Sequence, residues 1–241
     1  MRYLINMSYD GSKFYGYQIQ NNEKTVEGEI ERILSKILNI KINTIASSRT
    51  DRGVHALNQY CHFDYDKKID TKKLKHSINS LIDKSIYIKK ISLVNSDFHA
   101  RYNVVEKQYI YKINMLDYDP INKDYIFQYN KKISRELLEI FINKISGCHN
   151  FKSFTSDKDK DNYERNIKVE YKIQNKTLYL KFTSSGFLRY MIRNIVGLLI
   201  DINEGKKKIE DIDLIFKSQN RTSCGRCAMS CGLYLDKIKF K

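Results

Sequence analysis

The sequence has little proline, no tryptophan and few cysteines: one Pro, no Trp and five Cys occur among 241 residues. An odd number of cysteines without a secretory segment predicts free thiols in a reducing compartment. The apolar runs are short, as around residues 195–200, whereas a membrane span needs roughly 18 consecutive apolar residues. These absences predict a cytoplasmic protein that does not cross a membrane.

Several catalytic motifs are also missing. The chain has no P-loop, no GxGxxG, no GxSxG and no HExxH, so kinase, NTPase, dinucleotide and hydrolase functions lose their usual support. Cys224, Cys227 and Cys231 form C-x2-C-x3-C, but a structural zinc needs four ligands. We therefore expect no metal and no cofactor, with a cysteine-bound metal protein as the alternative.

What the sequence has in excess is positive charge. Its 43 Lys and Arg against 28 Asp and Glu give a formal net charge of +15. A coding bias toward A and T, visible in the many Lys, Asn and Ile residues, accounts for part of this excess. The charge still lies well above the magnitude of about 2 to 8 suited to a small soluble domain. It predicts a polyanionic partner, nucleic acid first and an anionic membrane surface second.

Hydrophobic periodicity predicts the same order of elements twice. The first half has strands over residues 2–9, 42–47, 59–65 and 86–93 and helices over 25–39 and 70–82. The second has strands over 107–114, 167–174, 177–183 and 233–240 and helices over 134–145 and 187–203. We predict an α+β fold of two ferredoxin-like (RRM-like) halves, 1–104 and 105–241, with a mixed, mainly antiparallel sheet and a central cleft.

The stretch SRTDRGVHA at residues 48–56 places Asp51 between Arg49 and Arg52. Two nearby guanidiniums are expected to lower the pKa of this carboxyl and keep it ionised. An ionised carboxylate suits a nucleophile or an electrostatic stabiliser, not a general acid. Taken alone, the pattern is more often a surface turn without chemistry.

The stretch GFLRYMIRNIVG at residues 186–197 predicts a helix that is apolar on nearly all sides, hence buried. Arg189, Arg193 and Gly197 share one stripe at four-residue spacing. A buried Arg193 needs a carboxylate or phosphate partner, and Asp51 is one candidate; snorkelling to solvent is the alternative. In EKQYIYKI at residues 106–113, Tyr109 stands two residues after Lys107, an arrangement suited to stacking a base while holding a phosphate, or simply to sheet packing.

These stretches, together with three others, resemble the tRNA pseudouridine synthase A family in order and spacing over essentially the whole chain. SRTDRGVHA is similar to the family signature GRTDAGVHA. The other matches are YDGSKFYGYQIQ (9–20, with Tyr17 where Trp is usual), DFHARY (97–102) with EKQYIYKI, GCHNFKSF (147–154) and FLRYMIRNIVG (187–197). Ser48 and Arg52 depart from the family's glycine and alanine. The ending CGRCAMSCGL puts cysteines at positions of small residues, which explains the cysteine cluster without metal.

The resemblance implies an isomerase that converts uridine to pseudouridine at positions 38, 39 and 40 of the tRNA anticodon stem-loop. It also implies a homodimer that uses no cofactor. Asp51 would be the nucleophile, Tyr109 would stack on the base and take the C5 proton, and Arg193 would form an ion pair with Asp51. We expect RNA contacts from five cations, namely Arg49, Arg52, Arg101, Lys107 and Arg189.

Three questions stay open at this point. A diverged paralogue would modify another RNA, such as ribosomal RNA. A protein of the same fold without catalysis would only bind RNA. Residue types also do not decide whether Asp51 attacks C1′ of the ribose or removes a C2′ proton to give a glycal.

Overall fold

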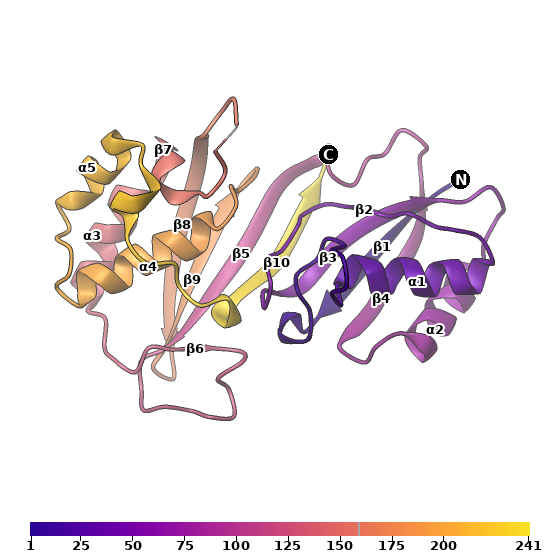
Figure 1. Cartoon of the computed structure of the whole chain (residues 1–241), viewed down its shortest axis with the longest axis horizontal. Helices are drawn as coiled ribbons and strands as arrows, with labels where there is room; N and C mark the ends of the chain where they lie inside the picture. The colour runs from indigo at the N-terminus through magenta and orange to yellow at the C-terminus, as the bar shows by residue number, and fades with distance from the viewer. Residues whose placement is uncertain (159) are drawn as a thin grey trace. The chain divides into compact units, whose positions relative to one another are not determined.

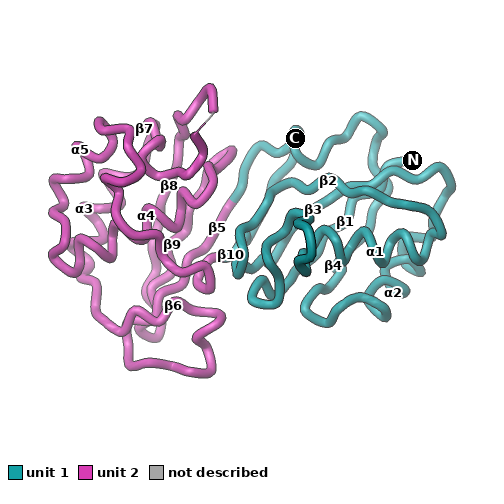
Figure 2. Tube along the Cα trace, in the orientation of Figure 1, with its two compact units in different colours: residues 1–107, 234–241 teal, residues 108–233 magenta. Residues whose placement is uncertain are grey.

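The computed structural model describes residues 1–158 and 160–241 and forms two compact units. The first comprises residues 1–107 and 234–241, and the second comprises residues 108–233 (Figure 2). The sequence placed the division at residue 104 and the last strand in the second half, whereas here all of that strand except its first residue belongs to the first unit. The α+β class predicted from the sequence is confirmed.

The first unit is a sheet with two helices packed beside each other, α1 (Val26–Leu38) and α2 (Thr71–Leu81) (Figure 1). Its strands follow the order β4 (Ile86–Val94), β1 (Arg2–Tyr9), β3 (His55–Asp64), and all neighbours are antiparallel. The short β2 (Ile45–Ala46) pairs with β3, which gives the strand order of a ferredoxin-like unit. The C-terminal β10 (Leu233–Phe240) adds to β3 in the parallel sense.

Local sequence explains the first helix and the first strand. Thr25 caps α1 by accepting a hydrogen bond from the Gly28 amide, and Asn39 ends the helix in a left-handed conformation at φ 55°. These are the residue types that favour the two ends of a helix. The buried side chains of α1 recur at helical spacing, at Val26, Ile30, Ile33 and Leu34. Those of β1 alternate along the strand, at Tyr3, Ile5, Met7 and Tyr9.

The second unit has a sheet in the order β5 (Val104–Asn114), β9 (Thr177–Ser184), β8 (Glu164–Gln174), β7 (Gly147–Asn150). Strand β5 starts in the first unit and enters the second at Gln108. The two-residue β6 (Phe127–Gln128) pairs with β5. Three helices complete the unit, namely α3 (Arg135–Ile145), α4 (Met191–Asn203) and α5 (Asp211–Ser218). The sequence reading missed β6, β7 and α5.

Two predicted elements differ from the structure in ways that matter for the site. Strand β3 begins at His55 and not at residue 59, directly after the Asp51 turn. Helix α4 begins at Met191 and not at residue 187, because Tyr190 adopts φ 61° and so interrupts right-handed helix. Arg189 therefore precedes the helix, and the predicted stripe of Arg189, Arg193 and Gly197 is wrong.

No helix in the described ranges, 1–158 and 160–241, has the length and apolar character that crossing a membrane requires.

Candidate active site

Asp51 lies in a tight turn that connects β2 to β3 in the first unit. The Val54 amide donates to the Asp51 carbonyl at 3.1 Å, and Gly53 adopts φ 78°. A turn with positive φ at its third residue favours glycine, since a Cβ is disfavoured there. The Asp51 residue is half-buried and Arg52 is exposed. The sequence therefore builds a hydrogen-bonded turn in which an acidic residue is followed directly by a basic one.

A second loop, residues 10–24, holds this turn through backbone contacts. The Tyr17 amide donates to the carbonyl of buried Thr50 at 3.0 Å, and the hydroxyls of Thr50 and Tyr9 lie 2.8 Å apart. Gly16 has φ +100°, and a Cβ there would lie 3.1 Å from the Thr50 carbonyl oxygen. Thr50, the residue before Asp51, is thus fixed on both its backbone and its side chain.

Gly11 and His55 join the same two loops on the other side of the turn. A Cβ on Gly11 would lie 2.0 Å from the Val54 carbonyl oxygen, so this close approach needs glycine. The Gly11 amide donates to Nδ1 of the buried His55 ring at 3.2 Å, and that ring stacks on Tyr234 with centroids 4.6 Å apart. The histidine of SRTDRGVHA therefore supports the turn structurally.

Lys107, at the start of β5, contacts the chain just before Asp51. Its Nζ donates to the Ser47 carbonyl at 2.8 Å and to Oγ of Ser48 at 3.3 Å. The buried Gln59 side chain donates to the Ser48 carbonyl at 2.6 Å. Burial, and secondarily the charge of Arg101, lower the pKa of Lys107 to about 8. The site therefore contains a cation that is tied to the Asp51 loop and whose charged form is disfavoured by burial.

Two further predicted RNA contacts, Arg49 and Arg101, are exposed in the same unit. Burial raises the pKa of the Glu27 carboxyl, while the charges of Arg49 and Arg101 oppose that shift. The charge of Arg101 also lowers the pKa of Lys107, so Arg49, Arg101 and Lys107 are linked through their electrostatic effects. Positive charges from distant parts of the sequence therefore act on the same region of the first unit.

Tyr109 is buried on β5 in the second unit, and its ring meets the Phe187 ring edge to face at 5.3 Å. Such a T-shaped pair fixes the orientation of an aromatic ring. Phe187 belongs to the segment before α4, which the sequence had assigned to the helix itself. The tyrosine that resembles the family's active-site residue is therefore held by packing.

Arg193 is half-buried in the first turn of α4, not fully buried as the sequence suggested. Its Nε donates to the Ala228 carbonyl at 2.8 Å, and the Ala228 amide donates to the Arg193 carbonyl at 3.0 Å. Its guanidinium carbon lies 5.2 Å from the centroid of the Tyr190 ring. A backbone carbonyl and an aromatic face thus set the direction of this side chain.

The loop that carries Ala228 is anchored to α4 by a second arginine. Arg226 donates through its amide and its Nε to the buried Asp201 carboxylate, at 3.1 and 2.6 Å, and it also pairs with Glu204. The Arg226 carbonyl lies so close to Gly197 that a Cβ there would come within 2.0 Å of it. Gly197 therefore lets this loop approach the helix that carries Arg193.

Arg189 is exposed and lies before α4. Its guanidinium carbon is 4.9 Å from the Tyr190 ring centroid, and its Nη2 donates to the Tyr190 hydroxyl at 3.2 Å. The Thr155 hydroxyl donates to the Arg189 carbonyl at 2.9 Å. Tyr190, which the sequence analysis did not select, thus contacts both arginines of this stretch.

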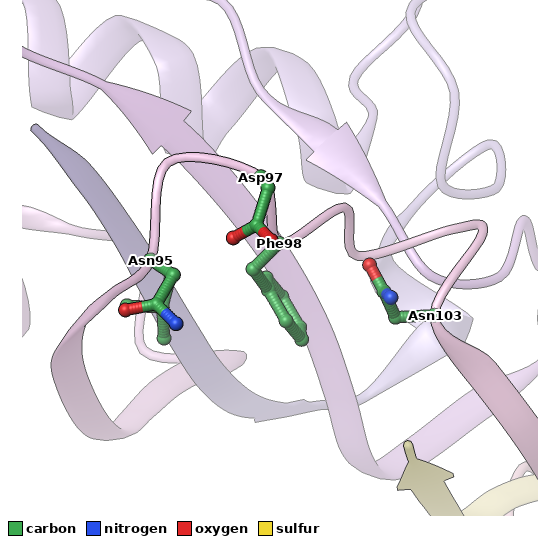
Figure 3. Close-up of a pocket in the computed structure, with 5 residues that line it drawn as sticks. Asn95, Asp97, Phe98 and Asn103 are labelled. Atoms are coloured by element: carbon green, nitrogen blue, oxygen red, sulfur yellow. The ribbon is translucent and has the colours of Figure 1, made fainter.

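A pocket in the first unit has none of the predicted site residues in its lining. It follows β4 and is lined by Val94, Asn95, Asp97, Phe98 and Asn103 (Figure 3). Asp97 is the one ionisable side chain of this lining. The pocket therefore lacks the charged constellation that the Asp51 turn carries.

The cysteines near the C-terminus do not form a metal centre in the part of the chain that the structure describes, where no group of three or more potential ligands occurs. Cys224 is buried, and burial raises its pKa to about 12. Cys227 is exposed and Cys231 is half-buried, with a pKa also raised by burial. A thiol with a raised pKa is a poor metal ligand and a poor nucleophile.

The predicted site residues fall in both units. The first holds Asp51, Arg49, Arg52, Arg101 and Lys107, and the second holds Tyr109, Arg193 and Arg189. The ion pair between Asp51 and Arg193 stays a prediction. The sequence did not identify Tyr190, Ala228 and Phe187 as residues that support the site. Their position in the sequence, close to Arg193 or within the cysteine cluster, was the signal that could have indicated them.

Comparison with known proteins gives consistent matches over the whole chain. A family model described as tRNA pseudouridine synthase matches residues 5–103 and 141–241. A protein of Mycoplasma genitalium named tRNA pseudouridine synthase A is 39% identical over 100% of this chain and 99% of the relative. Relatives of the same name from Malacoplasma penetrans and a Geobacillus species are 37% and 35% identical, each over at least 98% of both chains.

Proposed function

Because this chain belongs to the tRNA pseudouridine synthase family, we propose that it isomerises uridine to pseudouridine at positions 38, 39 and 40 of the tRNA anticodon stem-loop. The family makes the chain an isomerase with the pseudouridine synthase fold. The observation that carries the finer proposal is the Asp51 turn, in which Thr50, Gly53 and Gly16 fix the backbone on both sides of one half-buried carboxylate.

The proposed reaction begins with extrusion of the target uridine from the RNA, because an enzyme reaches the atoms of a base by flipping it out of the stack. Arg49 fills the space that the base leaves. Asp51, Tyr109 and Arg193 then surround the flipped nucleotide. Arg193 stabilises the negative charge of Asp51. Because Ala228 already holds Arg193 in place, the reaction needs no rearrangement of solvent to provide this positive charge.

Asp51 promotes cleavage of the bond between N1 of uracil and C1′ of the ribose. In one route its carboxylate attacks C1′ and forms an ester, and in the other it removes a C2′ proton and leaves a glycal. The released uracil keeps the electron pair of the broken bond on N1 and turns so that C5 bonds to C1′. In the first route the ester bond between Asp51 and C1′ breaks as this bond forms, and its electron pair returns to the carboxylate. In the second route the proton held by Asp51 returns to C2′. Tyr109 stacks on the base and takes the C5 proton, and N1 finishes protonated.

The surrounding cations supply affinity. Arg101, Lys107, Arg189 and Arg52 contact the RNA, and phosphate contacts position a nucleic acid without reading its sequence. The charge of +15 predicts binding that weakens steeply with salt. We further propose that the protein acts as a homodimer in the cytoplasm, without a cofactor.

The test uses tRNA transcripts tritiated at C5 of uridine, since isomerisation replaces the C5–H bond by C5–C1′ and releases tritium to water. Wild-type protein should release tritium, and primer extension on carbodiimide-treated tRNA should stop at positions 38, 39 and 40. Asp51→Asn should bind the same tRNA and release none.

If the wild-type protein released no tritium from any tRNA, the proposal that it is catalytic would be contradicted. The alternative, a protein of the same fold that only binds RNA, would then be favoured. Stops at other positions, or on ribosomal RNA only, would contradict the anticodon stem-loop and support a diverged substrate. Light scattering during size-exclusion chromatography measures the oligomer independently, and a monomer at assay concentration would contradict the homodimer.

A further inference from the structure

Arg52 and Tyr15 form a stacked pair beside the Asp51 turn. The guanidinium carbon of Arg52 lies 4.0 Å from the centroid of the Tyr15 ring. Arg52 is exposed, and Tyr15 keeps 38% of its surface accessible. The pair therefore places a flat cation on an aromatic ring at the surface, one residue after the proposed nucleophile.

The backbone on both sides of this pair is fixed. The Tyr15 amide donates to the Lys24 carbonyl at 2.9 Å, and the Gln20 side chain donates to the Tyr15 carbonyl at 2.7 Å. A Cβ on Gly16, the next residue, would lie 3.3 Å from the Arg52 amide nitrogen. The two backbones therefore approach each other closely at this point, beside Asp51.

Stability of the fold does not explain the pair well. An exposed cation–π contact contributes only about 0.5 to 1 kcal/mol. Within residues 1–158 and 160–241, Arg52 forms no hydrogen bond or ion pair, unlike the exposed Arg32, which is paired to Glu29 at 2.7 Å. The outer face and the N–H edge of the Arg52 guanidinium are consequently available to a ligand.

We propose that the Arg52–Tyr15 stack binds a nucleobase that neighbours the target uridine in the RNA. This inference rests on the proposed function. Guanidinium planes and aromatic rings are surfaces on which unpaired bases stack, and flipping the target uridine leaves its neighbour without a stacking partner. The base lies on the outer face of Arg52, whose inner face is already supported by Tyr15.

The planar shape of Arg52, and not only its charge, is the property on which this site depends. Lysine carries the same charge but is a compact ammonium that cannot offer a planar face to a base. A contact that uses only charge would accept lysine, as a phosphate contact does. Arg52→Lys therefore separates base stacking from phosphate binding.

The experiment measures binding to tRNA transcripts in which 2-aminopurine replaces one nucleotide adjacent to a uridine that the wild-type protein converts. Stacking on a base contributes enough that its loss should weaken affinity about tenfold. We expect that loss in Arg52→Ala, Arg52→Lys and Tyr15→Leu, with near wild-type affinity in Tyr15→Phe. The 2-aminopurine fluorescence should change on binding of the wild type and not of Arg52→Lys.

Arg32→Lys is the matched control, since it makes the same substitution at an exposed arginine on α1 and should leave affinity unchanged. A wild type that forms pseudouridine, together with an Arg52→Lys variant that retains wild-type affinity and fluorescence, would overturn the stacking site alone. A wild type that forms no pseudouridine in any tRNA would instead overturn the proposed function. Thermal unfolding confirms that each variant is folded before its affinity is compared.

Discussion

Arg193 and Ala228 bond to each other in both directions, through Nε to the Ala228 carbonyl at 2.8 Å and through the Ala228 amide to the Arg193 carbonyl at 3.0 Å. Replacing Arg193 by Met removes the first bond and keeps the second. The free energy of unfolding should fall by about 1 to 2 kcal/mol, since the variant loses a charged hydrogen bond and the contact with the Tyr190 ring. Tritium release should fall at least about 100-fold, as for loss of a preorganised charged donor.

Arg226→Met is the contrasting variant, because it removes the guanidinium from the buried Asp201 carboxylate and keeps only the bond from the backbone amide of residue 226. Breaking such a pair should reduce the free energy of unfolding by about 3 kcal/mol. Urea titrations of both variants make the comparison. If Arg193→Met were as unstable as Arg226→Met, the first arginine would have a structural role instead of a functional one.

Gly197 allows the loop of residues 221–232 to lie against α4. In Gly197→Ala the new Cβ would meet the Arg226 carbonyl oxygen at 2.0 Å, so the loop must move. We expect a loss of about 2 to 3 kcal/mol in the free energy of unfolding, together with reduced activity, because Ala228 follows in the same loop. Gly186→Ala, where no atom lies within 4 Å, should change stability by less than about 0.5 kcal/mol.

Tyr190 keeps an unfavourable backbone conformation, φ 61°, while its ring lies under Arg193 and Arg189. Tyr190→Gly should remove left-handed strain and raise the free energy of unfolding by up to about 1 kcal/mol. Its kcat should nevertheless fall, since the arginine loses its aromatic support. Tyr190→Phe should retain most of the activity.

Asn175→Gly tests the same strain where no site residue lies, in the turn between β8 and β9 at φ 49°. It should raise stability slightly and leave kcat unchanged. A Tyr190→Gly enzyme with wild-type kcat would refute the positioning role of this ring.

Lys107 should lose its proton near pH 8. Its pKa in the folded protein is about 8 against an ordinary value of 10.5, so between these values the unfolded chain binds more protons than the folded one. The free energy of unfolding must therefore rise with pH across that window, relative to Lys107→Met. Competitive acetylation provides a direct measurement, with half-maximal reactivity of Lys107 expected near pH 8. A midpoint near 10.5 would be incompatible with this environment.

The parts of the fold that follow from local sequence were predictable. Helix α1 has an apolar stripe and a threonine cap, and its observed bounds, Val26–Leu38, lie within one residue of the predicted ones. The start of α4 was not predictable, since nothing in FLRYMIR indicates that Tyr190 takes a left-handed conformation. The eight-residue helix α5 and the four-residue strand β7 are short elements whose periodicity is too weak to detect.

The candidate site also has features that the local sequence predicts and features that it does not. The Asp51 turn was visible because glycine and charge are local signals. The support of Arg193 by Ala228 was hidden, because any residue type supplies a backbone carbonyl. The stack of Arg52 on Tyr15 joins residues 37 positions apart by number, and only the tertiary structure reveals it.

Gly11, Gly16 and Gly53 influence how a mutational scan of this protein should be interpreted. None of them contributes a reactive atom, yet each has a neighbouring backbone or a φ angle that resists any side chain. A scan scored by tRNA modification alone would rank these glycines beside Asp51 and so count too many catalytic residues. Scoring protein abundance in parallel would separate the two groups, since substitutions at the glycines deplete the folded protein and Asp51→Asn does not.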